Sequence, residues 1–202
     1  LKDHKLRFVD LNEDDVRMVP LSTGFTTLKQ IALPVEILKA DYVISMPKLK
    51  THHWAGATLA MKNLFGLMPG SYYGWPKNVL HYAGLQESIL DINATVRPQF
   101  AIVDGIVGME GDGPILGTAK PAGVLVLGTN LPAVDASAAR VMGLDPARIR
   151  YLADANGWLG PIAEEAIHQV GENLADVRTP FELVEKIPAH KALLDKESGA
   201  AY

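Results

Sequence analysis

The residues best suited to chemistry lie in the stretch PKLKTHHWAGATLAMKNLFGLMPG, positions 47–70. Its basic residues are Lys48, Lys50, His52, His53 and Lys62. The apolar run at 42–46 directly before it predicts a buried strand that ends at Pro47. Basic side chains at the end of a buried strand can bind an anion or transfer protons. The stretch therefore indicates the place of a working site and leaves the reaction open.

Histidine and lysine side chains are the candidates for catalysis. An imidazole with its ordinary pKa of about 6.5 can act as a general acid or base, or bind a metal when neutral. His52 and His53 are adjacent, so in an extended chain they point to opposite sides, and which of them faces the site stays open. His81 and Lys62 complete this set, and an exposed helical stripe is the alternative explanation for Lys62.

The neighbouring polar residues are the candidates for substrate binding. Lys48 and Lys50 are two positions apart, so in an extended chain both project to one side and can clamp one carboxylate or phosphate. A solvated strand end is the alternative for these lysines. Thr51 and Asn63 complete the substrate-binding set. The expected ligand is a small anionic molecule.

A second polar segment, at 104–114, is rich in glycine and in acids. Asp104, Glu110 and Asp112 follow the apolar run at 100–103, and their carboxylates can hold a divalent metal such as Mg²⁺. They can instead pair with the lysines, or remain solvated in a surface loop. Asp135, in the first turn of an expected helix, is either a fourth member of this metal set or a complement to the helix dipole.

Strands and helices alternate along the chain, which predicts an α/β layered domain with a mostly parallel central sheet flanked by helices. Buried strands are expected at 41–46, 100–103 and 123–127, and parallel alignment would bring the polar segments after them to one rim. Further strands are expected at 6–11, 28–33, 166–170 and 181–184. Helices are expected at 34–40, 57–68, 83–96, 132–142 and 146–155, with a loosely ordered tail at 190–202.

Composition limits the classes of protein. The 202 residues, 48% hydrophobic, suit a single domain, and the net charge of −4 argues against a nucleic-acid binder. The absence of cysteine rules out disulfides and an iron–sulfur cluster within this chain. No apolar run is long enough for a bilayer span, so we expect no membrane insertion and a cytoplasmic protein. The chain starts at Leu1, so a fragment or a removed leader stays open.

Three motifs together resemble a prokaryotic family, the domain of unknown function 362: residues 47–70, IVDGIVGMEGDGP and LPAVDASAARVMG. The resemblance covers nearly the whole chain. It implies an association with iron–sulfur proteins, since some members carry a ferredoxin-like module, although this chain has no cysteine for a cluster. It also implies that a further N-terminal segment usually precedes the part seen here.

A fainter similarity links the order His52, Lys62, His81 to lactate racemase-type enzymes, whose histidines and lysine serve a nickel-pincer cofactor. This similarity implies proton or hydride chemistry on a small carboxylate. Our first hypothesis is therefore an enzyme acting on a small anionic substrate, with a divalent metal as a potential cofactor. The alternative is a non-catalytic domain that docks with a ferredoxin-like redox partner, supported by an aromatic loop, Tyr72, Tyr73 and Trp75, that is expected to be exposed. The third hypothesis is a purely structural domain in which the basic and acidic segments form a network of ion pairs.

Overall fold

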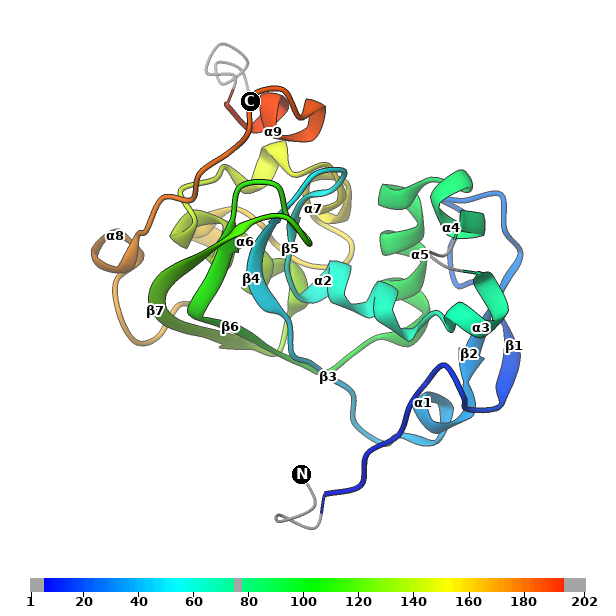
Figure 1. Ribbon diagram of the computed structural model, residues 1–202. Coiled ribbons are helices and arrows are strands. Elements are labelled where there is room, and N and C mark those ends of the chain that lie inside the picture. The colour runs from blue at the N-terminus through cyan, green and yellow to red at the C-terminus, as the bar shows by residue number, and fades with distance from the viewer. Residues whose placement is uncertain (1–5, 75–77, 195–202) are drawn as a thin grey trace.

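The computed structural model describes residues 6–74 and 78–194 (Figure 1). A small antiparallel sheet pairs β1 (Val16–Pro20) with β2 (Gln30–Pro34). The main sheet contains the remaining strands of the described residues: β3 (Ile44–Ser45), β4 (Lys48–His52), β5 (Gly56–Thr58), β6 (Phe100–Glu110) and β7 (Thr118–Gly128). With its helices, this arrangement confirms the predicted α/β fold with a central sheet flanked by helices.

The long strand β6 organises the main sheet. β3 and β4 pair with it in parallel, and Pro47 between them is buried while its carbonyl accepts a hydrogen bond from the amide of Asp104 at 2.9 Å. Ala101 pairs with both Ser45 and Gly128, so β7 lies on the opposite side of β6 from β3. β5 closes the other edge by pairing antiparallel with β4.

Helices surround this sheet. Their bounds are α1 (Val35–Lys39), α2 (Ala60–Asn63), α3 (Gly70–Tyr73), α4 (Asn78–Tyr82), α5 (Leu85–Val96), α6 (Leu131–Val141), α7 (Arg150–Ala155), α8 (Leu174–Val177) and α9 (Pro188–Leu194). Short 3-10 helices, η2 (Leu64–Leu67), η3 (Pro146–Arg148) and η4 (Glu164–Ala166), extend or connect them. Within the described residues, no helix has the length and apolar character needed to cross a bilayer.

Local signals explain the two longest helices. In α5, Leu85, Ile89, Ile92 and Val96 recur at helical spacing and turn inward. α6 begins at Asn130, whose side chain accepts a hydrogen bond from the amide of Ala133 at 3.0 Å. Both helices confirm the predicted ones within two residues.

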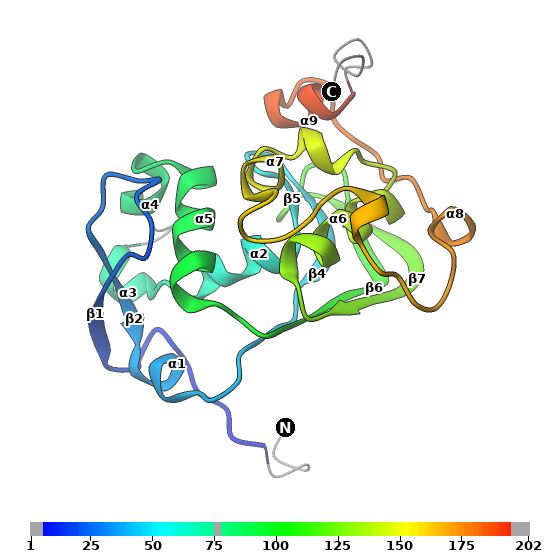
Figure 2. The same ribbon diagram turned by 180° about the vertical axis from the view of Figure 1, so that it is seen from behind.

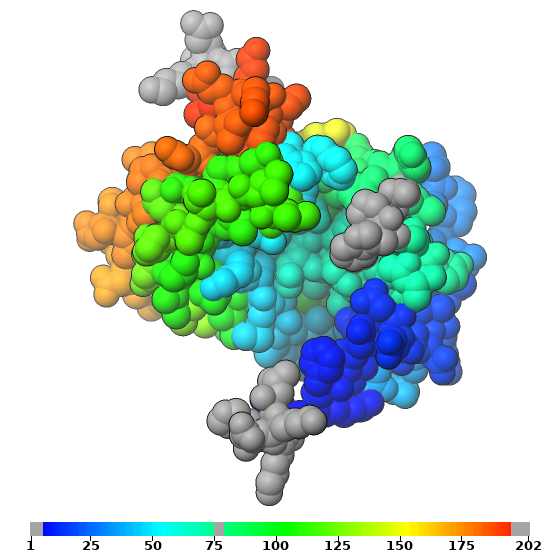
Figure 3. Space-filling model, viewed as in Figure 1, coloured from blue at the N-terminus to red at the C-terminus, as the bar shows by residue number. Residues whose placement is uncertain are grey.

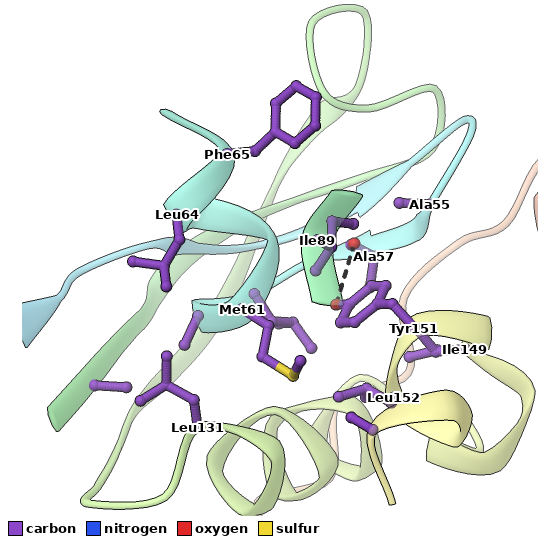
Figure 4. Close-up of a cluster of buried hydrophobic side chains, with 14 of the residues drawn as sticks. Ala55, Ala57, Met61, Leu64, Phe65, Ile89, Leu131, Ile149, Tyr151 and Leu152 are labelled. Carbon is purple, nitrogen blue, oxygen red and sulfur yellow. Dashed lines mark hydrogen bonds between the residues drawn. The ribbon is translucent and has the colours of Figure 1, made fainter. Parts of the chain in front are cut away.

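The core lies between the sheet and the helices. α6 packs against β6 and β7, and together with α7 it covers the face of the sheet that is turned to the viewer in Figure 2. Figure 4 shows Met61 of α2 pointing into this core among Leu131, Tyr151 and Leu152, and all four side chains are buried. The core therefore fixes α2 rigidly against the domain.

Two polar segments that were expected to follow buried strands are themselves strands. Residues 48–52 form β4, in which Leu49 and Thr51 are buried, because the chain resumes pairing with β6 beyond Pro47. Residues 104–110 continue β6, so Asp104 and Glu110 belong to a strand.

The predicted convergence of three strand ends is wrong for the third strand. β7 runs antiparallel to β6, and its last residue, Gly128, pairs with Ala101 near the start of β6. The segment after β7 therefore lies at the opposite end of β6 from residues 111–114.

Other predicted elements differ in detail. Residues 6–11, 166–170 and 181–184 form no strand, and β1 takes the place beside β2. Residues 57–68 divide into β5, α2 and η2 rather than one helix. Residues 190–194 belong to α9, so the expected loose tail is wrong there, and its remainder at 195–202 lies outside the described residues.

Candidate functional site

The site is built on the hairpin between β4 and β5. The pairing runs from Lys50 with Thr58 to His52 with Gly56, so residues 53–55 make a tight turn. Gly56 closes this turn at a φ of +81°, a conformation that favours glycine. Figure 3 shows this cyan segment reaching the surface between the green β6–β7 hairpin and the blue-green helical region.

His52 is fixed by this turn. Its ring is only 6% exposed, and Nδ1 accepts hydrogen bonds from the amides of Trp54 at 3.0 Å and Ala55 at 3.2 Å. A nitrogen that accepts two amide protons carries no proton itself, so the proton of the neutral imidazole resides on Nε2.

The surroundings of His52 keep it neutral. Burial is the largest cause that lowers its pKa from 6.5 to about 3, and the charges of Lys62, His53, Lys50 and His81 lower it further. These electrostatic effects require the four groups to lie near the imidazole. Partial burial also lowers the pKa of Lys50.

His53 faces the end of the β6–β7 hairpin. Its Nδ1 lies 3.7 Å from Oδ1 of Asp112, and its backbone amide donates to the carbonyl of Gly113 at 2.9 Å. Thr51 Oγ1 donates to the carbonyl of Gly111 at 2.7 Å. A Cβ at Gly113 would lie 2.2 Å from the carbonyl oxygen of Thr51, so the close approach of the two chains requires glycine there. The Thr51 side chain thus holds the site together and is not exposed to a ligand.

A row of ring contacts links His52 to Lys62. Ring centroids are separated by 5.0 Å for His52 and His53, 4.7 Å for His53 and Trp54, and 5.1 Å for Trp54 and His81. Phe65 continues the row at 5.3 Å from His81, and Nζ of Lys62 lies 4.5 Å from the Phe65 centroid. We name Lys50, His52, His53, Lys62 and His81 the basic cluster. All four residues predicted as catalytic, His52, His53, Lys62 and His81, belong to it.

Asp135 holds the start of α2, the helix that carries Lys62, and is not part of an acidic site. Its fully buried carboxylate accepts hydrogen bonds from the amides of Ala60 at 2.7 Å and Met61 at 2.9 Å, at the start of α2. Burial raises its pKa to about 7, although the two amides act in the opposite direction. The prediction that Asp135 complements the dipole of its own helix is wrong. Its carboxylate instead caps α2, the helix that carries Lys62.

His190 on α9 is a further neighbour of the turn at residues 53–55, and it was not among the predicted site residues. Its ring is fully buried, and Nδ1 accepts a hydrogen bond from the amide of Val184 at 3.1 Å. Burial lowers its pKa, while the His52 carbonyl and Asp112 act to raise it, which places the ring beside the turn. No local sequence signal marks it as a neighbour of the site, because His52 and Asp112 lie far away along the chain.

The remaining predicted residues lie apart from the basic cluster. Lys48 pairs with Asp104 at 2.8 Å, and both side chains are well exposed. The Asn63 amide donates to Ser45 Oγ at 3.1 Å. Glu110 pairs with Lys120 at 3.1 Å and accepts a hydrogen bond from the amide of Glu182 at 2.8 Å.

The predicted acidic metal set is therefore divided among separate places. Its members, Asp104, Glu110, Asp112 and Asp135, each have different partners. Across residues 6–74 and 78–194, no three histidine or carboxylate side chains gather in a group that could hold a metal ion. The chemistry of the site is thus derived from the basic cluster and Asp112.

Comparison with known proteins gives the family. The chain is 30% identical over 153 residues to the thylakoid-associated protein sll1697 of Synechocystis sp. (strain ATCC 27184 / PCC 6803 / Kazusa). The match covers 73% of this chain and 47% of that protein, so the chain spans about half the length of this curated relative. No solved structure matches. A family model described as Domain of unknown function (DUF362) matches residues 1–140, which include the basic cluster and Asp135. The chain belongs to this family, as its three motifs predicted.

Proposed function

We propose that this domain is an enzyme that binds a small carboxylate at the basic cluster and transfers a proton on it. The observation that carries the proposal is the buried, neutral His52 among two lysines and two further histidines. A structural domain gains little from collecting like charges around a buried ring, because their repulsion opposes folding.

Lys50 and Lys62 are the groups proposed to bind the anion. Lys50 is partly buried, and Lys62 is partly buried beside the Phe65 ring. Charges in a partly desolvated site attract an anion more strongly than they would in water.

His52 is proposed to act as a neutral hydrogen-bond donor. Because Nδ1 is held by two backbone amides, Nε2–H is the donor left for a substrate oxygen. A fixed donor stabilises negative charge that develops on an oxygen during the reaction. A neutral imidazole suits this role when the substrate loses a proton from the carbon beside a carbonyl group.

His53 and Asp112 are proposed to move the proton. With Asp112 next to Nδ1, His53 Nε2 can accept a proton while the carboxylate stabilises the imidazolium. The C–H electron pair would move toward the carbonyl oxygen held by His52, and return of the proton restores a C–H bond. The similarity of His52, Lys62 and His81 to lactate racemase-type enzymes supports a small 2-oxo or 2-hydroxy acid as substrate.

Oxalate binding tests the anion site, since oxalate resembles the planar product of such a deprotonation. We expect oxalate to raise the melting temperature of the wild type, with a much smaller effect in Lys50→Met and Lys62→Met. Lys29→Met, at an exposed lysine between β1 and β2, is the matched control. Equal stabilisation of all four proteins would overturn the assignment.

A docking role is the second candidate. Of the aromatic loop predicted for it, Tyr72 is exposed, Tyr73 is buried, and Trp75 lies outside the described residues. The side chains of Trp54 and Tyr82 are 56% and 90% exposed, and Trp54 contacts His81, the residue before Tyr82. The relative named as thylakoid-associated supports docking to a partner, and a ferredoxin-like protein is the partner we propose. Co-purification that is lost in Trp54→Ala and Tyr82→Ala, with oxalate binding unchanged, would favour this role.

A further inference from the structure

A pocket lies at the opposite end of β6 from the basic cluster. Its volume is about 400 Å³, and it opens where β7 ends and α6 begins. Its polar and aromatic lining includes Thr23, Asn93, Arg97, Thr129, Asn130 and Trp158. None of the residues that line it belongs to the basic cluster. A volume of this size is typical of pockets that bind small molecules.

Arg97 is the cation of this pocket. It follows α5 with a φ of 50°, in the left-handed region, and its Nε donates to the carbonyl of Ala94 at 3.1 Å. That hydrogen bond fixes one edge of the guanidinium. No carboxylate in the described part of the chain forms an ion pair with Arg97, and no acidic residue lines the pocket. The remaining guanidinium N–H groups suit a carboxylate ligand.

The wall opposite α6 is held by a buried carboxylate. Asp91 is 1% exposed and accepts hydrogen bonds from Thr23 Oγ1 at 2.6 Å and Thr26 Oγ1 at 2.7 Å. It also accepts from the amides of Phe25 at 3.1 Å and Thr26 at 2.9 Å. The loop at 22–26 is therefore anchored before any ligand binds, which lowers the ordering cost of binding.

An aromatic side chain forms another wall. Trp158 stacks on Phe25 with ring centroids 5.1 Å apart and an interplanar angle of 24°. Its Nε1 donates to the carbonyl of Asp154 at 2.6 Å, so the indole is held in place. The Asn130 side chain donates to the carbonyl of Leu159 at 3.2 Å, which ties this loop to the start of α6. An oriented indole offers a planar apolar surface to a ligand.

We propose that this pocket binds a small monocarboxylate that carries a planar ring. One arginine with no acidic neighbour selects a single negative charge, the hydroxyl group of Thr129 supplies a further hydrogen bond, and Trp158 contacts the ring. The site is separate from the proposed catalytic cluster and does not depend on its function.

Benzoate is the probe, with benzamide as its uncharged analogue. We expect millimolar benzoate to shift the amide NMR signals of Asn93 and Asn130 and the indole signal of Trp158, and benzamide to have little effect. In Arg97→Gln, benzoate affinity is expected to fall at least about tenfold, because a hydrogen bond to a charged group is lost. Arg17→Gln, at an exposed arginine of β1, and His53→Gln should bind benzoate like the wild type.

Two results would overturn the proposal. One is the absence of wild-type signal changes at millimolar benzoate, and the other is equal affinity in wild type and Arg97→Gln. If Arg97→Gln does not fold, Trp158→Leu and the location of the wild-type signal changes still decide the question. Changes confined to His52–Trp54 would assign benzoate to the basic cluster instead.

Discussion

Replacing His52 by asparagine should remove a large acid sensitivity from the stability of this protein. The folded state holds His52 neutral down to a pKa of about 3, whereas in the unfolded chain it takes up a proton below its ordinary value of 6.5. The unfolded state thus binds more protons in this window, so the free energy of unfolding falls as pH drops from 6.5 toward 3. The free energy of unfolding falls by about 1.4 kcal/mol for each pH unit in this window, or by roughly 5 kcal/mol in all.

The assay is urea unfolding of wild type and His52→Asn between pH 8 and pH 4.5. Asparagine keeps a side-chain oxygen that can accept the hydrogen bonds from the amides of Trp54 and Ala55. The variant therefore removes the titratable group while the turn is retained. The stability of the wild type relative to the variant should fall by about 3 kcal/mol between pH 6.5 and 4.5. His168→Asn, at an exposed histidine, is the matched control. A difference between wild type and His52→Asn that does not change with pH would refute the electrostatic account of the site.

Three further perturbations test the supports of the site. Asp135 has a folded pKa raised to about 7 from 3.8, so its stabilising contribution is present below pH 3.8 and is lost as pH rises through 7. The stability of the wild type relative to Asp135→Asn should therefore fall by roughly 4 kcal/mol from pH 3.8 to 8 in urea unfolding, opposite in sign to the His52 effect. Gly113→Ala should destabilise the protein by about 1–3 kcal/mol by thermal unfolding, because the new methyl group meets the Thr51 carbonyl; an unchanged melting temperature would contradict this packing. His190→Phe leaves the buried amide of Val184 without its acceptor and should cost about 1–3 kcal/mol, whereas unchanged stability would show that α9 is not fixed there.

The α/β class and the main helices could be predicted from local patterns. Apolar spacing predicted α5, and Pro132 marked the first turn of α6. The members of the basic cluster also lie close along the chain, since one hairpin and the helices after it contain all of them. Local signals suffice where the partners are near in sequence.

Strand direction was the property that local patterns could not supply. The third strand was expected to be parallel, yet residues 111–117 are too few for a parallel crossover once β6 and β7 have their full lengths. Because β7 runs antiparallel to β6, Asp135 lies far from Asp112 and contacts the start of α2 instead. The glycines at 108 and 113, in the glycine-rich segment, allow the backbone of β4 to approach closely, since a Cβ there would meet Leu49 or Thr51.

Proton exchange in deuterated water tests the central claim most directly. Pyruvate carries a carboxylate beside a carbonyl group, and its methyl protons would be the ones that His53 removes and returns. With wild-type protein, the methyl signal in ¹H NMR spectra should decay well above the rate in buffer, and His53→Gln and Lys62→Met should abolish most of this excess. Exchange at the same rate with wild type, both variants and buffer would contradict proton transfer at the basic cluster.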